Sequence, residues 1–150
     1  MSYDIISGTE AAYVINNEEL PFISCKGITY GRTDLLVESL HSFLLQDYPK
    51  DKCELVIVND YPLQKLHYPH PQVKIYNLDT TFPLIGEKEN YAIERCQGPL
   101  IAVWDDDDVA LPNHLHNIAR HWKDDTNIIH WETGIYYNEP NITKIMGVGN

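Results

Sequence analysis

Four consecutive aspartates, Asp105 to Asp108, are the residues of this chain whose type and spacing most directly suggest chemistry. They directly follow the apolar run Leu100–Trp104. Two carboxylates about 4 Å apart repel by about 4 kcal/mol at an effective dielectric constant near 20. A folded site must therefore offset this repulsion with a cation, with protonation or by splaying the side chains apart.

A divalent cation is the first candidate for that role. If the run continues an extended strand, Asp105 and Asp107 lie on one side and Asp106 and Asp108 on the other, because side chains alternate along a strand. Two carboxylates on one side can share one Mg²⁺ or Mn²⁺, and magnesium commonly takes only one or two protein carboxylates together with phosphates and water. The alternative is a solvated acidic loop that caps the next helix.

The elements that must position these aspartates are read from apolar periodicity. Leu36, Leu40, Phe43 and Leu44 recur at helical spacing within the segment 32–46 and predict an amphipathic helix. Further helices are predicted over 87–97, ending before Gly98-Pro99, and from Pro112 to about Trp122. Strands are predicted over 22–28, 54–58, 73–76, 100–104, 127–133 and 142–148.

Near-continuous apolar strands separated by helices predict an α/β fold with a mostly parallel central sheet and helices on both faces. In such Rossmann-like sheets, ligands bind beyond the carboxyl ends of the strands. The four aspartates follow the carboxyl end of the fourth predicted strand, so we expect the site there.

Composition narrows the class of partner. The 150 residues are 43% hydrophobic, which suits one domain, with residues 1–20 as an N-terminal extension. Lys and Arg number 11 against 22 Asp and Glu, a formal charge of -11, which argues against nucleic acid or an anionic membrane as partner.

The sequence offers neither a transmembrane run nor a secretory signal, so we expect a cytoplasmic protein. Cys25, Cys53 and Cys96 form no CxxC pair and are expected to be buried thiols.

Four segments together resemble the family 2 glycosyltransferases with a GT-A fold. The segments are "PFISCKGITYGRTDLLVESLHSFLLQDYP", "ELVIVNDYP", "IGEKENYAI" and "GPLIAVWDDDDVALPNHL", and the similarity spans roughly Pro21 to Trp122. The resemblance implies a metal-dependent enzyme that binds a nucleoside diphosphate sugar and transfers the sugar to a hydroxyl acceptor, with inversion.

The resemblance also implies which residues contact the nucleotide. Thr29, Tyr30 and Arg32 occupy the segment that packs against the base, although Gly31 replaces the usual Asn. Asp60 takes the position of a carboxylate that accepts a hydrogen bond from the base. Because a carboxylate accepts but does not donate, it suits the N3–H of uracil, and a UDP-sugar is favoured.

The remaining positions concern the diphosphate and the metal. Lys88 is placed to meet a diphosphate oxygen, whereas Glu89 stands where relatives often have a basic or a small residue. By resemblance, Asp105 and Asp107 hold the Mn²⁺ or Mg²⁺ ion, and Asp105 and Asp106 approach the nucleotide sugar. We expect the acidic run to be weakly ordered until metal and diphosphate enter.

No residue is assigned as the catalytic base, which in inverting relatives lies further along the chain in the acceptor-binding half. Residues 123–150 contain no matching motif and Glu132 is not assigned, so the acceptor half is expected to be truncated or absent. Two alternatives stay open. The chain is a non-catalytic nucleotide-sugar-binding module or the donor half of a longer enzyme, or it is a phosphohydrolase whose nucleophile loop is "VWDDDDV".

Overall fold

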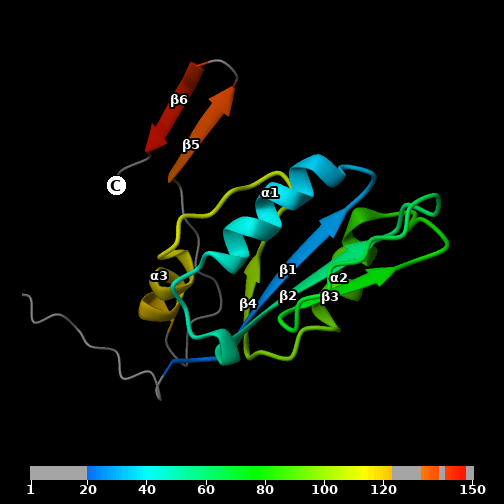
Figure 1. Ribbon diagram of the computed structural model, residues 1–150, viewed down its shortest axis with the longest axis horizontal. Helices are drawn as coiled ribbons and strands as arrows, with labels where there is room; N and C mark the ends of the chain where they lie inside the picture. Colours follow the sequence, from blue (N-terminus) through cyan, green and yellow to red (C-terminus); the bar gives the residue numbers. More distant parts are fainter. Residues whose placement is uncertain (1–19, 123–132, 139–140, 148–150) are drawn as a thin grey trace, which may run out of the picture. The chain divides into compact units, whose positions relative to one another are not determined.

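The computed structural model describes residues 20–122, 133–138 and 141–147 (Figure 1). The described residues up to Ala119 form one compact unit, and those from Arg120 onward form a second. The first unit is built on a four-stranded, wholly parallel sheet with strand order β3-β2-β1-β4. Its strands are β1 (Ile23–Thr29), β2 (Cys53–Asn59), β3 (Val73–Asn77) and β4 (Leu100–Val103).

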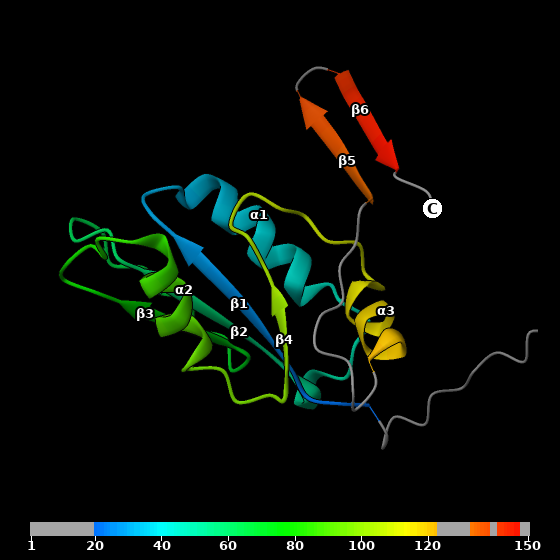
Figure 2. The same ribbon diagram turned by 180° about the vertical axis from the view of Figure 1, so that it is seen from behind.

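Two helices cover opposite faces of this sheet, α1 (Thr33–Leu44) and α2 (Ile85–Ile93) (Figures 1 and 2). α1 buries Leu36, Leu40 and Phe43, whereas Leu44 is only half-buried. Both helices are shorter than predicted, because α1 ends at Leu44 rather than Gln46 and α2 runs over 85–93 rather than 87–97. The predicted α/β fold with helices on both faces is confirmed.

The register of the sheet brings the ends of β1 and β2 to the same level. Thr29 pairs with Asn59, so the next residues of the two strands, Tyr30 and Asp60, emerge side by side at the carboxyl edge. All seven residues of β2 are buried, as expected for an inner strand of a parallel sheet. The sheet thus sets two of the predicted nucleotide contacts next to each other.

The close approach of β1 and β4 depends on Gly27. A Cβ atom at this position would lie 2.6 Å from the carbonyl oxygen of Trp104, so no larger residue fits without a shift. The amide of Trp104 donates to the carbonyl of Lys26 at 2.8 Å, which extends the pairing of the two strands by one residue. Gly27 therefore allows the chain to stay close to β1 as far as Trp104, the residue before the acidic run.

A short 3-10 helix, η1 (Lys50–Lys52), precedes β2, and α3 (His114–His121) follows the acidic run. The second unit contains an antiparallel hairpin of β5 (Thr133–Asn138) and β6 (Asn141–Gly147). The strand predicted over 142–148 is close to β6. The strand predicted over 127–133 shares only Thr133 with β5, and its residues 127–132 lie outside the described residues.

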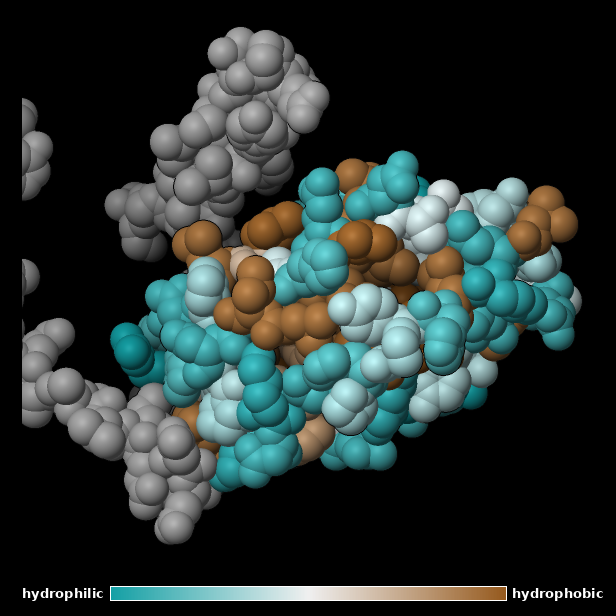
Figure 3. All heavy atoms as spheres, viewed as in Figure 1, coloured by the Kyte–Doolittle hydropathy of each residue, from teal (hydrophilic) through white to brown (hydrophobic). Residues whose placement is uncertain are grey.

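The surface of the first unit mixes polar and apolar residues. Hydrophobic residues gather around α1 on the face seen in Figure 3. Leu35 and Val37 of α1, and Leu45 directly after it, are exposed. None of the helices in the described ranges is both long and apolar enough to cross a membrane. Cys25, Cys53 and Cys96 are free thiols, the first two buried and the third half-buried, which agrees with the expected state for two of them.

Candidate functional site

A cavity of about 250 Å³ opens at the carboxyl ends of β1 and β2. Five of the predicted nucleotide-contacting residues line it, namely Thr29, Tyr30, Arg32, Asp60 and Lys88. Its remaining wall is apolar and comes from Ile28, Phe82, Leu84 and Ile85. Residues that are up to 60 positions apart in the sequence thus meet at the edge where the strand order predicts a ligand site.

Asp60 and Lys88 form a buried ion pair at the floor of this cavity. The exposed fractions of the two residues are 2% and 6%. Lys88 donates from Nζ to Asp60 Oδ1 and, at 2.7 Å, to the carbonyl oxygen of Thr29, while the other carboxylate oxygen of Asp60 accepts the amide of Phe82 at 3.0 Å. The predicted contact of Lys88 with a diphosphate oxygen stays a prediction, because this ammonium group is held by protein acceptors.

Tyr30 presents a half-exposed ring beside this pair. Its exposed fraction is 49%, its ring centroid lies 4.8 Å from that of Tyr61, and Lys88 Nζ lies 5.9 Å from its centroid. Gly31 follows with a φ of +71°, in the left-handed region that favours glycine, and turns the chain toward α1. About half of Tyr30 thus stays exposed at the cavity, while its ring contacts Tyr61.

The acidic run does not continue the strand. β4 ends at Val103, and the amide of Asp108 donates to the carbonyl of Asp105 at 3.3 Å, which closes a turn. The prediction that Asp105 and Asp107 lie opposite Asp106 and Asp108 in an extended chain is therefore wrong. α1 holds the turn, because Ser39 donates from Oγ to the carbonyl of Asp105 at 2.7 Å.

Within the turn, Asp106 points inward and Asp107 outward. Asp106 is 2% exposed and accepts the hydroxyl of Thr29 at 2.7 Å. Arg32 donates to both oxygens of Asp106 and, at 3.0 Å, to Asp107. The guanidinium group of Arg32 offsets the repulsion within this pair of carboxylates, whereas from the sequence a divalent cation was the first candidate for that role.

Asp108, the last carboxylate of the run, lies in surroundings that disfavour its ionised form. The pKa of Asp108 lies above its ordinary value, first because the surrounding protein displaces water from the carboxyl group and then because Asp105, Asp107 and Asp106 repel its ionised form. His114 lies close by, its ring 5.7 Å from that of Trp104, and burial lowers its pKa. Charge interaction with His114 opposes the rise in the pKa of Asp108 only in part.

Lys26 is a second buried lysine, in addition to Lys88, and its charge interacts with that of Asp105. Lys26 in β1 is 4% exposed and pairs with Glu89 of α2. Burial lowers the pKa of Lys26, an effect that Asp105 and Cys96 partly oppose. The carboxylate of Glu89 is thus paired with a buried lysine of β1.

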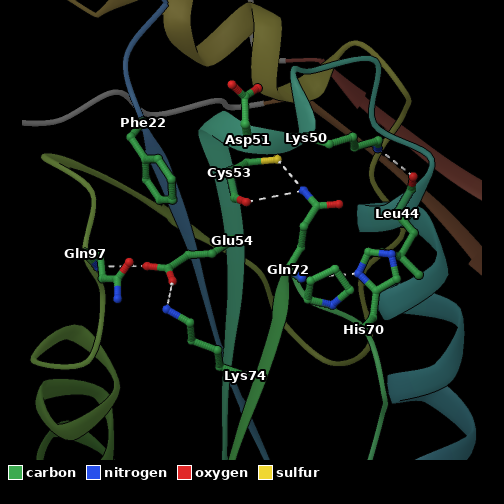
Figure 4. A pocket seen from close by; sticks show the side chains of 11 residues that line it. Phe22, Leu44, Lys50, Asp51, Cys53, Glu54, His70, Gln72, Lys74 and Gln97 are labelled. Carbon is green, nitrogen blue, oxygen red and sulfur yellow. Dashed lines mark hydrogen bonds and ion pairs between the residues drawn. The ribbon is translucent and has the colours of Figure 1, made fainter.

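A larger hollow, of about 610 Å³, lies at the amino ends of the strands and contains none of the predicted site residues (Figure 4). Its wall includes Glu54, which accepts hydrogen bonds from Lys74 at 2.6 Å, Ser24 at 2.6 Å and the amide of Gln97 at 2.8 Å. Burial raises the pKa of Glu54, but these donors outweigh it and the net shift is downward. Because Glu54 at its wall is held by protein donors, we interpret this hollow as structural.

Sequence reasoning missed Phe82, Tyr61 and the serines of α1. Phe82 supplies both an amide donor to Asp60 and a wall of the cavity, yet it lies in a loop without a motif. Ser39 and Ser42 share the buried face of α1, and polar residues at apolar spacing on a helix were the available signal.

The fold and the site together define the class. A parallel Rossmann-like sheet, a cavity at its carboxyl edge and an acidic turn beside that cavity are typical of nucleotide-binding α/β domains. The pattern of the family described as glycosyl transferase family 2 matches residues 28–146. The chain belongs to this family.

Solved structures agree with this fold. The crystal structure of S. aureus TarS 1–349 is 24% identical, with a TM-score of 0.55 over 65% of this chain and 31% of that chain. The same protein in complex with UDP-GlcNAc is 24% identical, with a TM-score of 0.55 over 65% of this chain and 30% of that chain. Mannosyltransferase PcManGT from Pyrobaculum calidifontis, in complex with GDP-Man and Mn²⁺, is 23% identical, with a TM-score of 0.56 over 65% of this chain and 31% of that chain. The chain therefore spans less than a third of these structures, and no curated protein matches it.

Proposed function

We propose that this chain is the donor-binding part of a metal-dependent glycosyltransferase that binds a UDP-sugar and supports transfer of the sugar to a hydroxyl acceptor with inversion. The observation that carries the proposal is the cavity at the carboxyl edge of the sheet, which combines an apolar wall with the Asp60–Lys88 pair. Thr29 and Arg32, which line this cavity, also donate hydrogen bonds to Asp106 of the acidic turn. One end suits a nucleoside and the other suits a cation with its diphosphate.

The nucleoside end supports uracil. The hydrogen-bonding edge of uracil includes the N3–H donor, and Asp60 in the lining of the cavity is a side chain that only accepts. The ring of Tyr30, about half exposed, provides a face for stacking. The solved relatives bind UDP-GlcNAc in one case and GDP-Man in the other, so the choice of base is decided by experiment.

The acidic turn fits a divalent ion that is shared with a ligand. No three His, Cys, Asp or Glu side chains in the described part of the chain gather closely enough to hold a metal by themselves. Magnesium and manganese sites of nucleotide enzymes use one or two carboxylates and complete the shell with phosphate oxygens and water. Asp107, with a side chain 48% exposed, and Asp105 beside it are the proposed ligands. A bound ion there supplies Lewis-acid stabilisation of the leaving diphosphate.

Inverting transfer also requires a base that removes the proton of the acceptor hydroxyl. We assign none of the described residues to this role, and Glu132 lies outside the described residues. Activity of residues 1–150 by themselves is accordingly not part of the proposal. Binding without catalysis is the second candidate, and a cytoplasmic location stays a prediction from the sequence.

The test is a titration of UDP, GDP and their sugar conjugates with and without Mn²⁺, followed by the shift of the thermal unfolding midpoint. A ligand that binds only the native state stabilises it by mass action. We expect the largest shift with UDP-sugar and Mn²⁺ together, and Asp107→Ala should remove the part that depends on Mn²⁺. Asp79→Ala, which removes an exposed acid outside the cavity, is the matched control.

Equal shifts with and without Mn²⁺ would contradict metal dependence, and a larger shift with GDP than with UDP would contradict the uracil assignment. Release of free sugar from the bound donor would distinguish a catalytically competent chain from a binding module. These outcomes are independent of the acceptor.

A further inference from the structure

Arg32 makes the densest set of contacts at the acidic turn. It directly precedes α1, and its guanidinium group donates from Nε to Asp106 Oδ2 at 3.1 Å, from one terminal nitrogen to Asp106 Oδ1, and from the other to Asp107 Oδ2 at 3.0 Å. One arginine thus serves two neighbouring carboxylates. The planar fork of arginine is suited to such multiple contacts, whereas a lysine would provide only a point charge.

The two halves of this contact differ in burial. The side chain of Asp106 is 1% exposed, and Thr29 also donates to it, so its pairing with Arg32 is shielded from water. The side chains of Asp107 and Arg32 are 48% and 50% exposed, so their mutual contact lies in solvent. Exposed ion pairs contribute little and are readily exchanged, while removal of one partner from a buried pair is costly.

We propose that Arg32 is an exchangeable counter-ion of Asp107, which yields this carboxylate to a divalent cation and then donates its freed N–H group to a diphosphate oxygen. Throughout the exchange, the bonds to Asp106 keep the guanidinium group in place. This inference rests on the proposed function, and it names the residue that couples metal binding to nucleotide binding.

Charge supports the exchange. Asp106, Asp107 and Arg32 sum to one negative charge, so an incoming dication meets a site that is already half neutralised and competes with Arg32 for Asp107. A diphosphate that arrives with the cation gives the released guanidinium a new anionic partner, and charge-assisted bonds to phosphate are among the stronger hydrogen bonds. Metal and nucleotide should therefore each raise the affinity for the other by the same factor.

The experiment compares the wild-type chain with Arg32→Gln in two binding measurements. Free Mn²⁺ is titrated without nucleotide and followed by electron paramagnetic resonance, and UDP is titrated calorimetrically at saturating Mn²⁺. We expect Arg32→Gln to bind Mn²⁺ alone about tenfold more tightly and UDP about tenfold more weakly, within the usual range of coupling between sites. The opposite signs of the two changes are the signature of exchange.

Lys65→Gln is the matched control, since it removes an exposed cation that is paired with Asp79 outside the cavity, and it should leave both affinities unchanged. Arg32→Lys is the second variant, because it keeps the charge and lowers the risk of unfolding. It should preserve the weak Mn²⁺ binding of the wild type while losing part of the UDP affinity.

A loss of both affinities in Arg32→Gln, with an unchanged thermal midpoint, would overturn the exchange and leave Arg32 as a simple binding residue. Unchanged affinities would overturn it as well. Failure of the wild-type chain to bind UDP with Mn²⁺ would instead overturn the proposed function itself, so the two failures are distinguishable.

Discussion

The side chains at the floor of the cavity serve the fold as well as the ligand. Asp60 and Lys88 are both buried, and Lys88 also holds the last carbonyl of β1. A buried ion pair is weak evidence of added stability, yet the loss of one partner leaves an uncompensated charge away from water. These residues therefore cannot be altered without consequences for folding.

Replacement of Asp60 by alanine should lower the free energy of unfolding by about 3–5 kcal/mol, because the ammonium group of Lys88 is left buried and unpaired. The double variant Asp60→Asn with Lys88→Met should recover much of this loss, since it removes both charges. Urea unfolding measures the effect. A single variant as stable as the wild type would show that Lys88 reaches water or another acceptor.

The raised pKa of Asp108 predicts how the stability of the chain depends on pH. Because its pKa is raised in the folded state, the folded chain binds more protons than the unfolded chain above the ordinary Asp value of about 3.9, and stability falls as the pH rises through the folded-state pKa. Asp108→Asn should therefore raise the thermal midpoint at pH 7 in the presence of a chelator, and this gain should vanish in acid below the ordinary Asp value.

Asp79→Asn is the opposite control for this pH effect. Lys65 lowers the pKa of Asp79, so the removal of this charge should not stabilise the chain at pH 7. Equal gains from both variants would point to general relief of the net negative charge rather than to Asp108.

At the scale of the elements, the acidic turn is placed by the strand before it and by the helix beside it. Gly27 allows β4 to approach β1, and Trp104 then donates from its indole nitrogen to the carbonyl of Ser39 in α1 at 3.1 Å. Ser39 in turn holds the carbonyl of Asp105. The position of the carboxylates thus depends on packing some distance from them.

Gly27→Ala should cost about 1–3 kcal/mol of stability, because the new methyl group meets a backbone carbonyl that cannot move aside. The turn should shift with it and weaken Mn²⁺-dependent UDP binding. Gly86→Ala in α2 is the control, since a Cβ there meets nothing within 4 Å and the helix should gain stability. Thermal unfolding of both variants decides the matter, and an equal response would refute the steric argument.

At the scale of the whole molecule, every predicted site residue lies in the first compact unit, which extends to Ala119. The second unit contributes a hairpin and none of the assigned contacts. The donor site should therefore be independent of the second unit.

A chain of residues 1–122 should unfold cooperatively and bind UDP with Mn²⁺ as tightly as residues 1–150. Calorimetric titration of the two chains, side by side, measures this. A large loss of affinity in the shorter chain would show that the second unit completes the donor site.

The sequence by itself determined the parallel sheet, the helices on both its faces and the edge of the sheet at which the cavity lies. These features follow from helical periodicity and from short apolar runs, which are patterns among residues close together in the sequence. Tyr30, Asp60 and Asp105 could be placed at that edge because each follows the carboxyl end of a strand.

Only the tertiary structure decided how the charges are shared. The pairing of Lys88 with Asp60, of Arg32 with Asp106 and Asp107, and of Lys26 with Glu89 joins residues from different elements, and no local pattern encodes such distances. The turn at the acidic run also depends on a contact between elements. β4 ends at Val103, and Ser39 of α1 then holds the carbonyl of Asp105 by a hydrogen bond. Long-range packing, rather than the spacing of the aspartates, therefore sets which carboxylate is buried and which is exposed.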